Sequence, residues 1–479
     1  MGKIYKRSVL KKMNILLVIS LLMYSFAIVL SFTELYKFCL IFLLIAGVFE
    51  LIGIKKKYDC YNTVILIFAL FSIIYGVSGP ITCLFGNGNI GFNFITYYNY
   101  GSWFLAYSLS QIGFIIGFCL VKMKKKDNLN NIFEDKNVDI IGKMSIFIMV
   151  LSAIFFIINL HRIGGISTLL LRKAVYQSRE SMLTLTLPAN ELSFISLAFF
   201  AIYISQTYQK KKCKLQYIIF ELLFLLPLLL KSIILGQRGF ILNTVFIMIM
   251  GISITHPIKK MNGKLLRFGI IMYLLLVFVY TNRAIVPLLQ TDKQEFFNRI
   301  VDTSRYVSNL NPGSNEFSAA FVNYNTFINN ESNISFKYGE SYLRGLALPI
   351  PSFLYPGTKP TQITYEFRNK YFSSLALTSS IASTGFSSIL EAYWNFGYIG
   401  VVIIYLLYGI ILGKVENKMK NKNIFSQILY LCICTCIISF SRYAFGDIFT
   451  SIIYFIIYTF FFLAIINNSK KRRGENKYE

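Results

Sequence analysis

Residues 209–260 read QKKKCKLQYIIFELLFLLPLLLKSIILGQRGFILNTVFIMIMGISITHPIKK, and this stretch determines the class of fold. It contains two apolar segments, 215–235 and 238–255, joined by the short turn GQRG. An α-helix rises about 1.5 Å per residue, so each segment is long enough to cross a hydrocarbon core of about 30 Å. Lysines flank the pair at its two far ends, away from the turn. Because cytoplasmic loops carry an excess of lysine and arginine, the stretch predicts two membrane-spanning helices whose joining turn faces outward.

The same alternation of apolar segments and basic clusters extends over the whole chain. Its 479 residues are 55% hydrophobic and only 15% charged, with a mean hydropathy of +0.57. The net charge of +26 lies in short clusters between apolar segments, which excludes nucleic acid as a partner and a soluble enzyme as the class of protein. We predict an all-α polytopic membrane protein with twelve spans, at residues 14–33, 37–54, 62–82, 103–121, 141–160, 189–208, 215–235, 238–255, 265–282, 387–413, 424–441 and 447–467.

The positive charges also predict the orientation of these helices. With the N-terminus in the cytoplasm, every inner segment is basic, and the inner segments hold 31 of the 48 lysines and arginines. The sequence therefore predicts a plasma-membrane protein with both termini cytoplasmic. Its expected divisions are 1–282 with nine spans, 283–386 as a large outer loop, 387–467 with three spans, and 468–479 as a basic cytoplasmic tail.

Lysine and arginine are distributed differently on the two sides. The inner side has 27 lysines and 4 arginines, whereas the outer side has 7 lysines and 10 arginines. Arginine presents a planar fork that suits phosphate and carboxylate, and it stays charged when partly buried. This asymmetry favours an anion-binding outer face. The alternative is that these arginines form ion pairs with outer carboxylates or contact lipid headgroups.

The loop between the ninth and tenth spans is unusually long, and loops of this length are usually functional. Its first part, 292–330, is expected to form short helices. Its middle, LALPIPSFLYPGTKP, contains four prolines and is expected to be extended and turning. Its last part, SSLALTSSIASTGFSS, is small and polar and continues directly into the tenth span.

Three residues near the predicted outer face are candidates for chemistry. Arg238 lies between two glycines in GQRG, where the backbone can approach a ligand, although snorkelling would place an arginine there too. Arg344 is expected in a rigid loop that presents its guanidinium, with an ion pair to Glu340 as the alternative. Glu391 begins an apolar span, where a carboxylate costs ~2.5–3.5 kcal/mol unless it is paired or hydrated. It is a candidate general base or an anchor for an arginine.

Two further arginines could contact an anion on the same side. Arg442 follows the eleventh span, where an ion pair with Asp447 is the alternative. Arg172 lies in an outer segment with Lys173 and Arg179, which could equally be a solvated basic loop. The sequence contains no D-x-D, H-E-x-x-H, G-x-S-x-G or Walker motif in a suitable context, so it signals no metal, cofactor or nucleotide site.

Two longer stretches resemble a known family. They are YGESYLRGLALPIPSFLYPGTKP at 338–360 and STGFSSILEAYWNFGYIGVVIIYLLYGIILG at 383–413. Together with GQRG, Arg442 and the late long loop, they are similar to the O-antigen polymerase (Wzy) family of oligosaccharide repeat unit polymerases. The resemblance implies a GT-C-like bacterial inner-membrane glycosyltransferase that needs neither nucleotide sugar nor metal. Its expected substrates are undecaprenyl-diphosphate-linked oligosaccharides, as donor and acceptor. The expected product is a surface polysaccharide such as O-antigen or capsule, with a chain-length regulator as a possible partner.

The resemblance also suggests roles for the candidate residues. Arg238, Arg344 and Arg442 would hold the diphosphate leaving group, with Arg172 as a further contact. Glu391 would orient or deprotonate the attacking sugar hydroxyl, or fix an arginine. Tyr393 and Trp394 would stack on sugar rings, although an aromatic belt at the membrane interface explains them as well.

Two other functions compete with polymerisation. An O-antigen ligase has a similar plan, but ligases typically use a histidine in the large loop, and this loop contains none. A lipid-linked oligosaccharide flippase or other transporter tends to be built from related halves with short loops, whereas this chain has one very long loop and no visible repeat.

Overall fold

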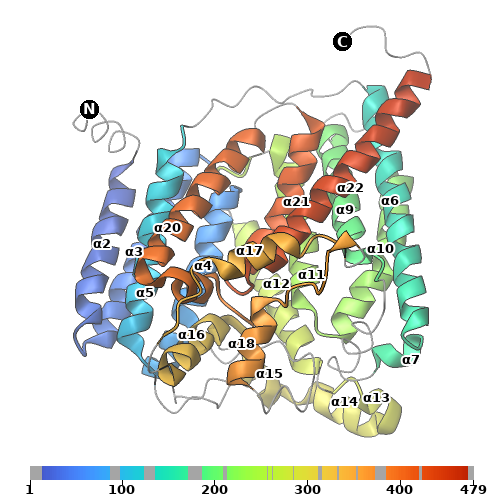
Figure 1. Ribbon diagram of the computed structural model, residues 1–479. Helices are drawn as coiled ribbons and strands as arrows, with labels where there is room; N and C mark the ends of the chain where they lie inside the picture. The colour runs from blue at the N-terminus through green and yellow to red at the C-terminus, as the bar shows by residue number, and fades with distance from the viewer. Residues whose placement is uncertain are drawn as a thin grey trace.

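The computed structural model describes residues 13–86, 98–122, 135–170, 186–208, 213–255, 257–260, 263–283, 285–310, 316–331, 334–351, 354–372, 385–419 and 423–472. Within these ranges the regular structure is entirely helical, and no strand occurs there. The long helices run side by side as a bundle (Figure 1). Helix α2 begins and α22 ends at the same end of this bundle, which we call the terminal end. The short helices α13–α16 and α18 lie toward the other end, the loop end.

Each of the twelve predicted ranges overlaps one long helix. Eight helices are long and apolar enough to cross a membrane, by length and composition, in the described part of the chain. The protein is therefore a multi-pass membrane protein, while twelve as the number of spans stays a prediction. The long helices are α2 (Ile15–Ser31), α3 (Tyr36–Tyr58), α4 (Val64–Phe85), α5 (Tyr100–Leu120), α6 (Asp135–Arg162), α9 (Ala189–Tyr208), α10 (Leu215–Ile234), α11 (Arg238–Thr255), α12 (Gly263–Asn282), α20 (Ser388–Met419), α21 (Ile424–Phe440) and α22 (Phe445–Arg472).

Small residues allow α5 and α20 to pack with their backbones in contact. A Cβ atom added at Gly113 would lie 2.5 Å from the Val402 carbonyl oxygen, and one at Gly117 only 2.2 Å from that of Leu406. Gly409 on α20 approaches α5 just as closely. Without a hydrophobic force between helices in lipid, such close approach is a main source of helix association. This contact fixes α20, which carries the candidate site, against the bundle.

Helix α20 is bent near the loop end. Phe396 and Gly397 leave helical geometry, and Gly397 has φ of 63° and ψ of −155°. Only glycine adopts this region readily, so the residue type permits the bend. The continuous span expected at 387–413 is thus a short helical segment that carries Glu391, followed by a longer one.

The large loop begins with short helices, as predicted. They are α13 (Leu288–Thr291), α14 (Lys293–Val301), α15 (Thr303–Asn309) and the longer α16 (Ala319–Asn330). Helix α16 packs into the bundle. Its Tyr324 hydroxyl lies 2.9 Å from Ser102 Oγ on α5, and the Phe321 ring fills the space beside Gly79 on α4. This part of the loop therefore belongs to the core of the molecule.

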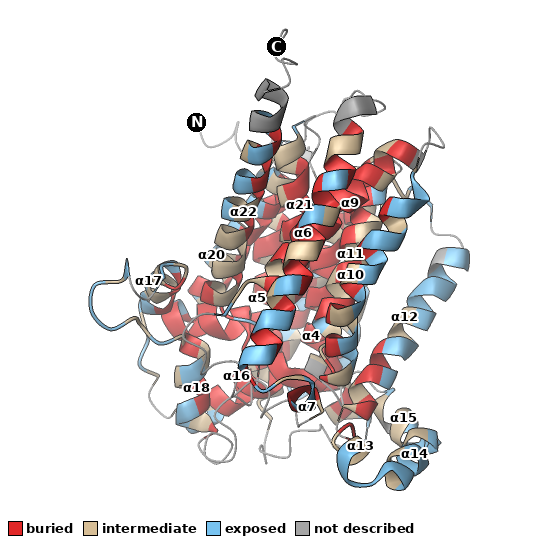
Figure 2. Cartoon of the chain, turned by 90° about the vertical axis from the view of Figure 1, so that its right-hand side faces the viewer, coloured by how far each residue is buried: buried red, intermediate tan, exposed pale blue. Residues whose placement is uncertain are grey.

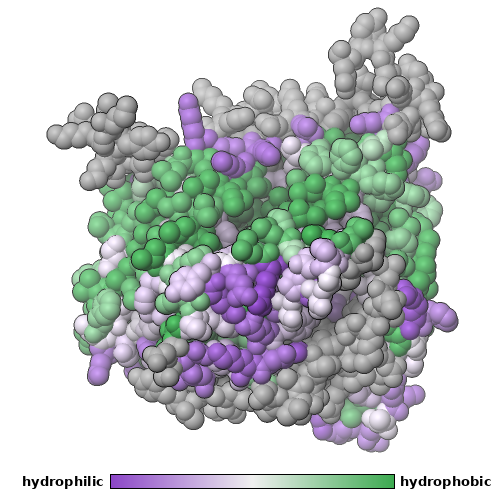
Figure 3. Space-filling view, in the orientation of Figure 1, coloured by the Kyte–Doolittle hydropathy of each residue, from purple (hydrophilic) through white to green (hydrophobic). Residues whose placement is uncertain are grey.

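Two further helices follow in the loop. Arg344, expected in a rigid loop, lies instead in the helix α17 (Glu340–Ala347), which is short enough to fit before the prolines begin. Helix α18 (Ile363–Tyr371) follows the proline-rich turns. Figure 3 shows an apolar band across one face of the molecule and a hydrophilic patch below the band, where α17 and α18 lie. Leu343 and Leu346 of α17 are exposed, 69% and 47%, so this helix presents both apolar and charged groups at the boundary.

Candidate functional site

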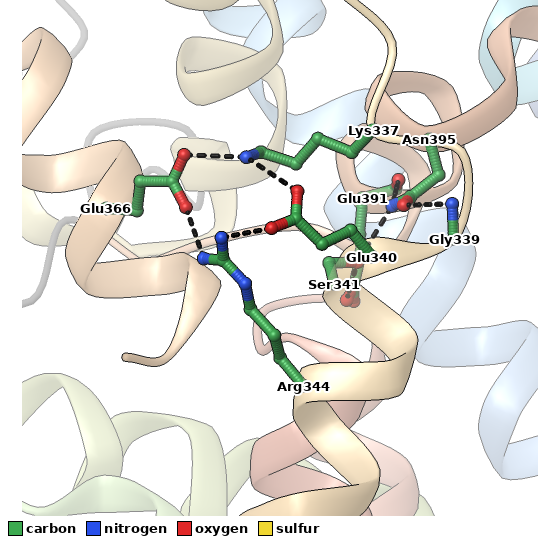
Figure 4. A network of polar contacts seen from close by, with 8 residues as sticks. All are labelled: Lys337, Gly339, Glu340, Ser341, Arg344, Glu366, Glu391 and Asn395. Carbon is green, nitrogen blue, oxygen red and sulfur yellow. Dashed lines mark hydrogen bonds and ion pairs between the residues drawn. The ribbon is translucent and has the colours of Figure 1, made fainter. Parts of the chain in front are cut away.

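Glu391 joins three segments that are distant in sequence. Its Oε1 accepts a hydrogen bond from the Ser341 hydroxyl on α17, 2.8 Å away, and its Oε2 accepts one from the Phe445 backbone N–H at the start of α22, at 2.7 Å. The side chain is buried, with only 1% exposed. Both carboxylate oxygens are thus engaged. The contact with Ser341 holds α17 against α20 (Figure 4), and the contact with Phe445 holds α20 against the start of α22.

The bend in α20 supplies the second attachment of this region. A bend frees carbonyls that would otherwise accept hydrogen bonds within the helix. The Trp394 carbonyl accepts from the Lys337 N–H at 3.0 Å, and the Asn395 carbonyl accepts from the Tyr338 N–H at 3.1 Å. The Asn395 side chain accepts from the Gly339 N–H at 2.9 Å and donates to the Ser341 hydroxyl at 2.8 Å. Hydrogen bonds from successive residues therefore attach the segment that leads into α17 to the bend.

Arg344 belongs to a network of four charged side chains (Figure 4). Its guanidinium pairs with Glu366 on α18 at 2.8 Å and with Glu340 one turn away on α17. Lys337 pairs with the same two carboxylates, at 2.7 Å to Glu366 and 3.7 Å to Glu340. The hydrogen bond from Arg344 holds the pKa of Glu340 below its usual range. The ion pair considered as the alternative for Arg344 is therefore present, and the network is balanced in charge.

A small pocket, with room for about one water molecule, lies beside this network. It is lined by residues of α17, of the start of α18 and of the turn between α21 and α22. These residues are Ser341, Arg344, Gly345, Leu348, Gln362, Ile363, Ala444, Gly446 and Asp447. The walls meet closely because Gly345 and Gly446 lack side chains: a Cβ at Gly345 would lie 2.9 Å from the Gly446 Cα. Arg344 and Asp447, which carry opposite charges, both line this pocket.

Arg442 lies in the turn between α21 and α22, next to this region. Its carbonyl accepts a hydrogen bond from the Phe386 N–H at 2.7 Å, just before α20 begins. Its guanidinium carbon lies 5.7 Å from the centre of the Tyr443 ring. The structure therefore gathers Arg344, Glu391 and Arg442 around the first turn of α20.

Arg238 has different neighbours from Arg344 and Arg442. It is the first residue of α11, and its guanidinium carbon is 4.2 Å from the centre of the Tyr280 ring on α12. A second guanidinium, that of Arg283, lies at the same distance from the same ring. Sequence reasoning missed Arg283, although its position three residues after Tyr280, at the end of an apolar helix, places both on one face.

The two aromatic candidates, Tyr393 and Trp394, are both buried. Tyr393 and Trp394 are 8% and 3% exposed. Tyr393 packs against Tyr398 with 4.9 Å between ring centres, and Trp394 packs against Phe327 on α16 at 5.1 Å. Their placement favours a role in packing the loop onto α20 rather than sugar stacking. Arg172 lies outside the described residues.

The fold and this site define a multi-pass membrane protein whose large loop folds back onto the helix bundle and carries a charged pocket at its surface. The chain belongs to the O-antigen polysaccharide polymerase Wzy family, whose model matches residues 13–473. No curated protein and no solved structure matches the chain. Membership confirms the resemblance found in the sequence, and it indicates a polymerising glycosyltransferase activity on lipid-linked oligosaccharide repeat units in the membrane.

Proposed function

We propose that the protein joins undecaprenyl-diphosphate-linked oligosaccharide repeat units into a surface polysaccharide, O-antigen or capsule, on the outer side of the bacterial inner membrane. The observation that carries this proposal is the family match over 13–473, nearly the whole chain. In this proposal both termini are cytoplasmic and the loop end faces outward. A chain-length regulator is a further partner suggested by the family resemblance.

The proposed reaction is a displacement at the sugar that is attached to the donor diphosphate. A hydroxyl oxygen of the acceptor repeat unit bonds to the anomeric carbon of that sugar, and the bond from this carbon to the diphosphate oxygen breaks. The hydroxyl proton passes to a base, and undecaprenyl diphosphate leaves with the bonding electron pair. Guanidinium groups favour this step because they stabilise the charge that develops on the leaving oxygen.

The contacts of Glu391 support a positioning role within this proposal. Both of its oxygens accept hydrogen bonds from the protein, so it holds Ser341 and the α17 helix that carries Arg344. Asp447 lines the same pocket as Arg344, so we propose Asp447 as the residue that accepts the proton. Sequence reasoning had considered Asp447 only as a partner for Arg442. The proposed ligands of the diphosphate remain Arg238, Arg442 and Arg172.

The decisive experiment uses the purified full-length protein in nanodiscs. The substrate is the lipid-linked repeat unit extracted from a strain of the same organism in which this gene is deleted, so that the sugar is the native one. No nucleotide sugar is added, and EDTA is present. We expect a ladder of glycans on a gel. Movement of the lipid across a liposome bilayer without a ladder would instead indicate a flippase, and transfer to a different lipid acceptor without a ladder would indicate a ligase.

A further inference from the structure

Helix α17 has an apolar ridge on its outer side. The ridge consists of Leu343 and Leu346, which are three residues apart, lie on one face of the helix and are both exposed. Ser341 and Gly345, which are four residues apart on α17, are both buried. Successive residues of a helix are turned by about 100°, so the two leucines lie roughly opposite the buried pair. The ridge therefore points away from the bundle.

The charged side chains of α17 lie on a separate face from this ridge. Glu340 and Arg344 extend toward α18, where Arg344 pairs with Glu366 (Figure 4). One apolar face and one charged face on the same short helix are typical of helices that lie in the interface between a bilayer and water.

The start of α17 is attached to α20 at a depth that follows from the length of that helix. The N–H groups of Lys337 and Tyr338 donate to the carbonyls of Trp394 and Asn395 on α20. Trp394 and Lys414, the first basic residue toward the other end of α20, are 20 positions apart in the chain. Such a length of helix spans about 30 Å, which is the thickness of the hydrocarbon core. The start of α17 therefore lies at the loop-end edge of that core.

The other end of α17 is attached to α22 at a similar depth. A Cβ added at Gly446 would lie 2.6 Å from the Leu348 side chain and 2.9 Å from the Gly345 Cα. Gly446 is the second residue of Phe445–Asn467, which is apolar and long enough to cross a membrane. Since both attachments lie where such a segment begins, the axis of α17 runs along the membrane surface. Figure 1 shows α17 crossing the long helices, and Figure 2 shows it outside them at one edge of the bundle.

The ridge is continuous with an apolar surface of the long helices. Every fourth residue from 399 to 411 of α20 is apolar and exposed, namely Ile399, Ile403, Leu407 and Ile411. This row begins next to the bend to which the start of α17 is attached. In Figure 3 the apolar band gives way to the hydrophilic patch at the level of α17. Acyl chains that cover the row on α20 therefore reach the ridge, and this continuity selects membrane lipid as its partner.

We propose that α17 is an interfacial helix that binds the bilayer leaflet at the loop end. Leu343 and Leu346 lie among the acyl chains, and Glu340 and Arg344 lie at the level of the headgroups. Contact with lipid then acts together with the Ser341 hydrogen bond in setting the position of α17. The proposal concerns the lipids of the bilayer itself, so it holds whether or not the protein is a polymerase.

The test introduces the photoreactive residue benzoylphenylalanine at one position at a time in the full-length protein. The protein is placed in nanodiscs of phosphatidylethanolamine and phosphatidylglycerol. Three positions are similarly exposed: Leu343 at 69%, Ile399 on α20 at 73% and Val301 on α14 at 74%. Figures 1 and 2 show α14 beyond the loop ends of the long helices, so Val301 is a matched control for an exposed apolar residue in water.

Mass spectrometry after illumination measures the yield of lipid adducts at each position. We expect yields at Leu343 and Leu346 within about threefold of that at Ile399, and roughly tenfold less at Val301, because only an interfacial helix contacts acyl chains. A yield at Leu343 as low as that at Val301 would place the ridge in water and overturn the proposal. A crosslinked dimer formed from Leu343 would also overturn it, because a second copy of the chain would then cover the ridge.

Hydrogen exchange of the α17 peptides gives a second measure. L343E places a charge among acyl chains, so we expect exchange of α17 in nanodiscs to become several-fold faster than in the wild type. V301E is the matched control and should leave the exchange of α17 unchanged. Wild-type exchange in L343E would refute the contribution of lipid to the position of α17. The photoreactive residue is itself apolar, so the first readout does not depend on the folding of L343E.

Discussion

Replacement of Glu391 by glutamine or by alanine separates a positioning role from a role as general base. Glutamine can keep both contacts: its carbonyl oxygen accepts from the Phe445 N–H, and its amide donates to the Ser341 hydroxyl, which also has lone pairs to offer. We expect E391Q to fold and to produce polymer within a few-fold of wild type. Glutamine cannot accept a proton at this position, so a general base would lose its function completely.

Alanine removes both acceptors from a site that water does not reach. The Phe445 N–H and the Ser341 hydroxyl each lose a buried partner, at a cost of about 1–3 kcal/mol for each group. We therefore expect E391A to lower stability by about 2–6 kcal/mol and to detach α17, with loss of polymer. Thermal unfolding of the purified protein, hydrogen exchange of the α17 peptides and the glycan ladder measure these effects.

A double mutant tests the specific contact. S341A removes the partner of one carboxylate oxygen, so E391A and S341A should be non-additive by about 0.5–3 kcal/mol. The positioning argument is refuted if E391Q unfolds at the wild-type temperature, protects α17 from exchange as well as the wild type does, and still makes no polymer. Glu391 would then be the base.

Three further predictions concern packing, pH and orientation. Replacement of Gly117 by leucine should abolish folded protein, because the backbone of α20 lies 2.2 Å from the new Cβ, whereas Gly269→Ala, which meets nothing within 4 Å, should be tolerated; size-exclusion chromatography distinguishes them. Arg344 lowers the pKa of Glu340 in the folded state, so this pair stabilises α17 at neutral pH and loses its effect as pH falls through that lowered pKa; hydrogen exchange of α17 should accelerate in acid, and less so in E340Q. A reporter that works only in the cytoplasm should be active when it is fused to the C-terminus. Activity of a reporter that works only in the periplasm, fused at the same place, would contradict the proposed orientation.

The positions of the long helices could be predicted from the sequence because the thickness of a bilayer sets the length of each apolar segment. Each needs about twenty apolar residues, and charged clusters mark the ends, so the twelve expected ranges match twelve long helices with bounds that differ by at most six residues. The bend at Gly397 could not be found in this way. It changes no apolar length, and its cause is a backbone conformation that one glycine among many adopts.

Contacts between residues that are distant in the chain could not be predicted from the sequence either. Glu340 lies four residues before Arg344, so a contact on one helix face could be weighed in advance. Glu366, which shares the same guanidinium, lies on another helix 22 residues away, beyond four prolines. Nothing in the local pattern specifies that α18 returns to α17. The same applies to Phe445, whose N–H reaches a carboxylate 54 residues earlier.

The excess of arginine on one side of the chain thus corresponds to two different physical situations. At Arg344 the carboxylates of Glu340 and Glu366 already balance the charge together with Lys337, so this arginine holds two loop helices together, and an anion would have to displace an ion pair to bind it. At Arg238 and Arg283 the two guanidinium groups share the face of the Tyr280 ring, which attracts cations. Residue type alone predicts that anions are bound on this side, but the neighbours of each guanidinium decide which arginine binds them.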